Sequence, residues 1–323
     1  MFYARGARGG AEQKGHVPPT WTILLVAAAS FNVSRQAYSQ LTNPAPLGRL
    51  HTTAGSVAAI DPLVLPPKQW AVEAARNEVS AIQYGSAYMR YHVHSSNAKG
   101  DQLRDVVESK DGAVARMILK DNRQLTAQED AAEHERLQSM LNSPSTFAKH
   151  IQSDVSGKHT AVELIGFIPD AMLFTYAPGQ PQRTGRSVHA GEAPEVVLDY
   201  RPNPAWTPPT IVSEALTGIQ GRLWIDKENH HLTRVEGNVF QGVNFGFGVF
   251  AHIYPGGTFA LEQTPVGQRW IFSSFSEHLT VRALMVKTVK EDSELRSSNF
   301  TPIREMNYKE AINLLLSTPL PPR

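Results

Sequence analysis

The segment GRLWIDKENHHLTRVEG, residues 221–237, predicts a β-hairpin. Leu223 and Ile225 alternate with more polar neighbours, which gives the first strand one apolar face, and the residues at 227–230 are typical of a turn. The same segment holds Asp226, Glu228, His230 and His231 within six positions, so a metal or acid/base cluster is the alternative. Adjacent residues of a strand face opposite sides of the sheet, and the polar residues of a turn usually lie in water. Both points favour a structural hairpin over a metal or acid/base site.

Strand patterns continue on both sides of this hairpin. Upstream, strands are predicted at 84–95, 103–110 and 113–120, with Asp111-Gly112 as a two-residue turn. A proline-rich loop at 201–209 follows another strand, EVVLDY. Downstream, strands are predicted at 221–226, 231–241, 245–254, 257–264, 269–276 and 278–290. Such short connections indicate an antiparallel sheet long enough to curl.

Helices are predicted between and around these strands. An amphipathic helix begins at Lys68 behind a proline pair, and Thr126 with Glu129 forms a capping box for a second helix. Ser143 and the proline after it open a further short helix. The apolar residues 160–176 are expected to form a buried helix that becomes extended and covers the sheet. The C-terminal NYKEAINLLLS segment predicts a short helix or a frayed tail.

Four parts are predicted along the chain. Residues 1–39 are interpreted as a signal peptide, because basic residues precede the apolar run WTILLVAAASF and Ala-Tyr-Ser supplies a cleavage site. An uncleaved N-terminal anchor is the alternative. Residues 40–67 are a proline-rich linker, 68–302 a folded domain, and 303–323 a C-terminal tail with a short helix. The expected location is the periplasm, with membrane contact only through the signal or anchor segment.

Composition excludes several kinds of site. The 323 residues include 31 basic and 30 acidic side chains without a long run of like charge, so no nucleic-acid partner is expected. The absence of cysteine excludes disulfides, thiolate metal sites and a cysteine nucleophile. No serine elbow or dinucleotide fingerprint is present. We therefore predict no enzyme activity, no catalytic residue and no cofactor.

A histidine metal site is the remaining enzymatic alternative. His92 and His94 are spaced to face one side of a strand, and His252 or His278 could supply a third ligand. Two polar residues on the exposed face of a strand explain the same pattern more simply. The prediction is accordingly that no metal is bound.

The apolar faces of the predicted strands are the feature that indicates a function, namely binding of a hydrophobic ligand. Alternation over the last predicted strands gives each of them one apolar side. In a half-closed sheet covered by a helix, such faces line a groove able to take an acyl chain. The predicted ligand-binding residues are Phe245, Phe247, Val249, Ile253, Val281 and Met285. The alternative is a structural or protein-interaction module of the envelope whose core is filled by these side chains.

The order of these signals resembles the periplasmic lipoprotein-sorting family, which contains the Lol-type outer-membrane lipoprotein carrier and its lipid-binding relatives. The resemblance spans roughly 68–300 and rests on LIGFIPDAMLFTY, VVLDYRPNPAWTPP, GRLWIDKENHHLTRVEG, GVFAHIYPGGTFALEQTPVGQRWIF and VRALMVKTV. It implies an α+β fold in which a curved antiparallel sheet forms an incomplete β-barrel covered by a few α-helices. It also implies binding of lipid or acyl chains without catalysis, in envelope lipid or lipoprotein trafficking. An envelope protein is the second kind of partner expected.

Overall fold

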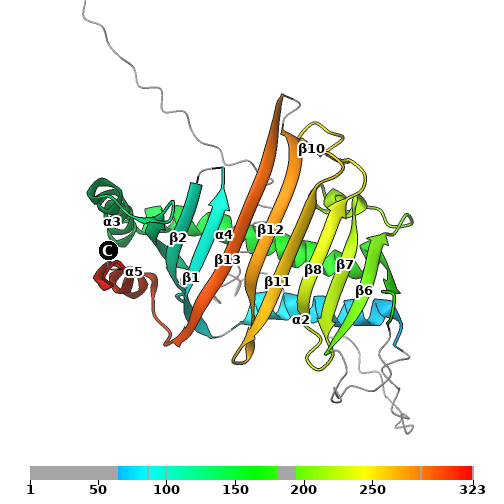
Figure 1. The fold of residues 1–323 in the computed structure, drawn as a ribbon, viewed down its shortest axis with the longest axis horizontal. Helices are drawn as coiled ribbons and strands as arrows, with labels where there is room; N and C mark the ends of the chain where they lie inside the picture. Colours follow the sequence, from blue (N-terminus) through cyan, green and yellow to red (C-terminus); the bar gives the residue numbers. More distant parts are fainter. Residues whose placement is uncertain (1–64, 86, 99, 181–193, 284–285, 322–323) are drawn as a thin grey trace, which may run out of the picture.

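The computed structural model describes residues 65–321 except 86, 99, 181–193 and 284–285. The predicted signal peptide, nearly all of the predicted linker and Met285 thus lie outside the described residues. Within the described part, one large antiparallel sheet carries helices on one face and at one end, as Figure 1 shows. The predicted fold class, α+β with a curved sheet open as an incomplete barrel, is confirmed.

The sheet has thirteen strands, and its main path runs β4-β3-β2-β1-β13-β12-β11-β8-β7-β6-β5. Strand β10 pairs with β12 and with β9, beside this path. The two end strands, β4 and β5, are not neighbours, so the sheet stays open. In chain order the strands are β1 (Tyr88–Asn97), β2 (Gly100–Val107), β3 (Val114–Lys120), β4 (Arg123–Gln124), β5 (Met172–Tyr176), β6 (Glu195–Pro202), β7 (Ile219–Asp226), β8 (Leu232–Val239), β9 (Val243–Phe245), β10 (Ala251–Ile253), β11 (Thr258–Val266), β12 (Arg269–Ala283) and β13 (Lys287–Ile303).

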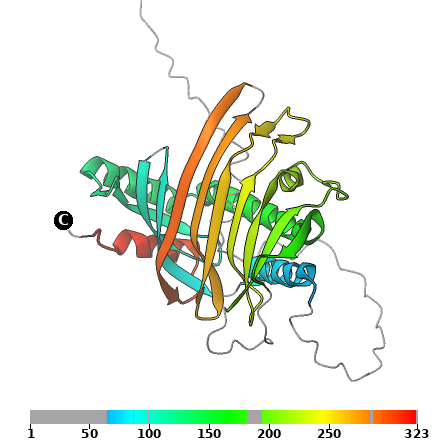
Figure 2. The same cartoon turned by 45° about the vertical axis from the view of Figure 1, so that its right-hand side comes forward.

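Two helices cross one face of the sheet, and two others pack at its β2–β3 end (Figures 1 and 2). The crossing pair is α2 and α4, whereas α3 and α5 contact β3. The helices are α2 (Pro67–Tyr84), α3 (Ala127–Asn142), α4 (Pro144–Ala171), the 3-10 turn η2 (Val212–Thr217) and α5 (Tyr308–Ser317). In the described part of the chain, no helix is both long and apolar enough to cross a membrane.

Helix α4 differs from its prediction. The sequence predicts a short helix after Ser143 and a separate buried one from 160, but the chain forms a single helix of 28 residues. The connecting turns carry Asp154 and Lys158, polar residues that are only partly exposed, so their pattern hides the helical periodicity. The expected change to extended structure is confirmed, because β5 begins at Met172.

The hairpin predicted from 221–237 is confirmed as β7 and β8. Its turn is closed by Asp226, whose carboxylate accepts the backbone N–H groups of Glu228 at 3.0 Å and Asn229 at 2.7 Å. The expectation that all its ionisable side chains lie in water is wrong for the histidines. His230 and His231 pair with Glu73 and Glu78 of α2, so the turn fixes the hairpin to this helix.

Three predicted strands differ in extent from the strands that form. The strand expected at 245–254 is instead the short hairpin of β9 and β10, because Gly246, Phe247 and Gly248 adopt positive φ angles between them. The strands expected at 269–276 and 278–290 are replaced by one continuous strand, β12, followed by β13. Every residue of β13 is exposed or half-buried, and the strand lacks apolar alternation, so pairing with β1 and β12 determines it.

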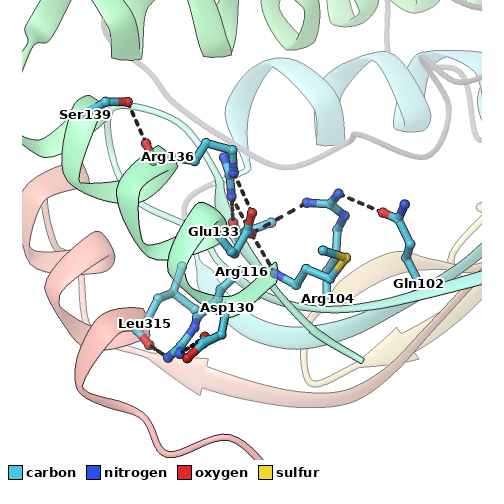
Figure 3. A network of polar contacts seen from close by, with 10 residues as sticks. Gln102, Arg104, Arg116, Asp130, Glu133, Arg136, Ser139 and Leu315 are labelled. Carbon is cyan, nitrogen blue, oxygen red and sulfur yellow. Dashed lines mark hydrogen bonds and ion pairs between the residues drawn. The ribbon is translucent and has the colours of Figure 1, made fainter. Parts of the chain in front are cut away.

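A polar network joins α3 to the sheet and to α5 (Figure 3). The buried Glu133 accepts the backbone N–H of Met117 at 2.7 Å and is held by Arg136. Burial acts to raise the pKa of Glu133, but the bonds from Arg136 and the backbone lower it overall. Arg116 donates to the carbonyl oxygens of Leu315 at 2.8 Å and Thr318 at 3.0 Å, which satisfies the C-terminal end of α5.

The glycine pair in the β7–β8 hairpin provides a test of the sheet geometry. Gly221 lies opposite Gly237, and a Cβ there would collide with the backbone carbonyl of Glu236. We expect Gly221→Ala to lower the free energy of unfolding by about 1–3 kcal/mol, the usual cost of overpacking. The matched control is Gly166→Ala in α4, where a Cβ meets nothing within 4 Å; it should raise the free energy of unfolding by roughly 0.5–1 kcal/mol. Urea titrations measure both, and equal effects would contradict this account.

Candidate ligand-binding cavity

A cavity of about 220 Å³ lies between the inner face of the sheet and the helices α2 and α4. Its lining is almost entirely apolar, with Glu78 as the charged residue and Gln263 as the amide. The apolar lining residues are Ala71, Ala74, Ala75, Ala161, Leu164, Ile165, Ile168, Met172, Tyr200, Ala215, Leu216, Ile219, Leu223, Leu232, Val235, Val239, Val243, Ile253, Phe259, Leu261, Phe272, Phe275 and Leu279.

The space exists because small side chains on α2 face large ones on the sheet. Helix α2 presents Ala71, Ala74 and Ala75 at i, i+3 and i+4, which is one helical face. Strands β11 and β12 present aromatic and aliphatic side chains from the opposite side. Protein interiors are normally close-packed, with few voids larger than a water molecule. An apolar cavity of this volume is therefore a specific feature of the fold.

Glu78 and Gln263 form a polar group in the cavity wall. Glu78 accepts the backbone N–H of Leu232 at 3.0 Å and pairs with the ring of His231 at 3.0 Å. The Gln263 amide donates to the second carboxylate oxygen, also at 3.0 Å. The hydrogen bonds of this carboxylate thus hold α2 against β8 and β11. They occupy both carboxylate oxygens, so the group does not require a bound cation.

Tyr200 shapes the wall formed by the sheet. Its hydroxyl donates to the carbonyl oxygen of Glu236 at 3.0 Å, and burial raises the pKa of this phenol. The ring crosses Gly237, where a Cβ would collide with the Tyr200 hydroxyl and the Phe259 ring. The glycine thus leaves room for the two aromatic side chains, and both residues line the cavity.

A charge cluster connects α4 with the residue after β2 and the first residue of β12. The buried carboxylate of Glu108, at the end of β2, accepts from the Met89 N–H at 3.0 Å and from Arg269 at 3.1 Å. Asp154 and Lys158 of α4 interact electrostatically with each other, and Lys158 also with Glu108 and Arg269. Burial raises the pKa of Glu108 to about 7 and that of Asp154 to about 6, and lowers the pKa of Lys158 to about 8.

These shifts predict how stability depends on pH. The folded pKa of Asp154 lies above the ordinary value of 3.8, so its contribution is present at low pH and is lost as pH rises through about 6. We expect the unfolding free energy to fall between about pH 4 and pH 7, and Asp154→Asn to make this fall smaller by roughly 2–3 kcal/mol. Urea titrations at several pH values measure it.

The matched control for this experiment is Asp170→Asn, which also removes a carboxylate from α4 but at a position where the side chain is 72% exposed. A pH dependence in Asp154→Asn identical to that of Asp170→Asn would contradict the assignment. Lys158 acts in the opposite direction above about pH 8, because a lowered folded pKa costs stability as pH falls. Measurements below about pH 7.5 therefore reduce the contribution of Lys158, and the comparison with Asp170→Asn separates Asp154 from groups such as His150 that titrate in the same range.

The six predicted ligand-binding residues occupy different environments. Ile253 lines the cavity. Phe245 and Val281 are buried in the neighbouring cluster, which shares Val239, Val243 and Leu279 with the cavity wall. Phe247 is fully exposed and Val249 is 53% exposed, both in the turn between β9 and β10. Met285 lies outside the described residues.

Sequence reasoning missed the helical half of the site. The available signal was the spacing of Ala71, Ala74 and Ala75 on the predicted amphipathic helix. Small side chains on the face of a helix that packs on the core either leave a cavity or let another element approach closely. The histidines of the alternative metal site are not brought together. His94 pairs with Asp101, His92 with Asn299, and His278 with Asp292. The described residues contain no group of three or more His, Asp or Glu suited to a metal ion.

The cavity and its polar wall define the candidate site by geometry alone. Comparisons of the chain with protein-family models, with curated proteins and with solved structures found no match.

Proposed function

We propose that this chain is a non-enzymatic protein that binds one acyl chain, or a hydrophobic ligand of similar width, in the cavity under α2 and α4. The observation that carries the proposal is the cavity of about 220 Å³ with its apolar lining. Leaving such a volume unfilled would cost about 5 kcal/mol at roughly 24 cal/mol per Å³. A bound chain removes this cost and gains about 0.8 kcal/mol for each methylene transferred from water.

The polar wall supports a particular orientation of the ligand. Glu78 is the charged residue of the lining, and its carboxylate would repel an acidic headgroup. The methyl end of the chain therefore enters first, and a polar headgroup stays at the mouth. A structural module with a filled core is the alternative, and it would not need a cavity of this size.

We place this activity in the periplasm, in envelope lipid or lipoprotein trafficking. The support comes from the predicted signal peptide at 1–39 and from the resemblance to the lipoprotein-sorting family. The open curved sheet with helices across one face is the architecture that this resemblance leads us to expect. No step of catalysis is part of the proposal.

Two measurements test the function. Mass spectrometry of protein purified from its native membrane envelope under detergent-free conditions should find a lipid or fatty acid in stoichiometric amount. A fluorescent fatty acid should bind to delipidated protein with a 1:1 stoichiometry. Protein that carries no lipid and also leaves the fluorescent fatty acid unbound would overturn the proposal.

A further inference from the structure

We propose that the sheet ends on an apolar tip that docks on a bilayer surface containing anionic lipids, where the cavity exchanges its ligand. The tip consists of Phe247, Val249 and Phe250 in the β9–β10 turn and Val286 in the β12–β13 connection. This inference rests on the proposed function, since it names the surface from which the cavity is loaded. It adds a membrane contact to the one expected from the signal or anchor segment.

The tip is exposed although its residues are among the most apolar of the chain. Phe247 is fully exposed, Val286 is 88% exposed, and Val249 and Phe250 are each more than half exposed. Pairing of Ala251 with Ala283, and of Ala283 with Lys287, brings the two turns to the same end of the sheet. Figure 1 shows this end beside the label β10 and the tips of β12 and β13, and Figure 2 shows it from another side.

The turn that carries Phe247 is held in shape. Phe247 has a φ of 59°, an uncommon conformation for an aromatic residue, and its full exposure leaves no packing to compensate for the strain. The Gly246 N–H donates to Glu214 at 2.8 Å, and the Phe250 N–H donates to the Phe245 carbonyl at 3.3 Å. A strained, fixed and exposed aromatic side chain suits insertion into an apolar phase better than contact with water.

The charges beside the tip identify the occupant. Lys287 and Lys290 are exposed on β13, and neither forms an ion pair within the described residues. Exposed aromatic residues flanked by cations match the boundary between acyl chains and anionic headgroups. The chemistry therefore favours an anionic bilayer over a protein surface.

The tip adjoins a buried cluster that reaches the cavity wall. Phe245 and Ala251 frame the exposed turn and belong to the buried cluster that includes Val243 and Leu279. These last two residues also line the cavity. One buried apolar cluster thus separates the exposed tip from the cavity wall, and no polar layer lies between them in this cluster.

The test uses site-specific fluorescence, which the absence of cysteine makes straightforward. Phe247→Cys in the full chain is labelled with an environment-sensitive dye and mixed with phosphatidylcholine vesicles with or without phosphatidylglycerol. The control is Gln268→Cys in the exposed β11–β12 turn, at the far end of β12, about 50 Å away at roughly 3.3 Å per residue. We expect a severalfold rise and a blue shift at position 247 with the anionic vesicles, and no change at 268.

The charged residues are tested with the double variant Lys287→Glu, Lys290→Glu, in the Phe247→Cys background. It should weaken the vesicle response by about tenfold or more. No response at 247, an equal response at 268, or no effect of the two charge reversals would each overturn the inference. Binding of the fluorescent fatty acid without vesicles is measured on the same samples. Loss of that signal alone would instead contradict the proposed function.

Discussion

Ala161→Phe should weaken binding of the fluorescent fatty acid by about 100-fold. Ala161 lies on α4 and lines the cavity, so the added ring takes the place of three or four methylenes of the ligand. At about 0.8 kcal/mol per methylene, the loss is about 3 kcal/mol. Because the ring enters existing space, the free energy of unfolding of the ligand-free protein should stay constant or rise.

The same substitution at Ala311 is the matched control. Ala311 is fully buried in the cluster between α3, α5 and the sheet, and it does not line the cavity. Ala311→Phe should therefore destabilise the fold by about 1–3 kcal/mol through overpacking, while ligand affinity is kept. Isothermal titration and urea denaturation separate the two effects. Unchanged affinity in Ala161→Phe would show that the ligand lies elsewhere.

Local sequence patterns are sufficient to predict strands where the sheet is built from hairpins. Alternation of Leu223 and Ile225, and the turn after Asp226, correctly predict β7 and β8 because pairing between sequence neighbours is set by nearby residues. The full extent of β13 is not predictable in this way, because KTVKEDSELRSSNFTPI is polar on both faces. Its partners, β1 and β12, supply the hydrogen-bond ladders, and no local window contains both of them.

The candidate site was predictable in kind but only partly in its residues. The alternation of side chains along a strand correctly predicts which of its sides is apolar, as for Ile253. This alternation no longer holds beyond the end of the strand. The glycines at 246 and 248 end the strand and turn Phe247 and Val249 outward. The helical half of the cavity depends on how α2 and α4 cross the sheet, a tertiary relation that alanine spacing indicates only once the sheet is known.

Arg269→Met is expected to produce the largest loss of stability. Arg269 is the cation that pairs with the buried Glu108, and its guanidinium also donates to the Ala87 carbonyl at 2.5 Å. Removing one partner of a buried pair leaves an uncompensated charge and costs about 3–5 kcal/mol. An equivalent change at the exposed Arg304, paired with Glu310, should cost less than about 1 kcal/mol.

The double variant Arg269→Met, Glu108→Gln tests whether the uncompensated charge, rather than lost packing, causes the loss of stability in Arg269→Met. The amide introduced by Glu108→Gln would keep an acceptor for the Met89 N–H but carries no charge, so the double variant should recover most of the stability lost in Arg269→Met. Loss of the arginine also raises the pKa of Glu108 further, so the single variant should be less destabilised at about pH 5, where the carboxyl is protonated, than at about pH 8. Additive single and double effects, or a cost independent of pH, would show that Arg269 acts mainly through its packing and its bond to Ala87.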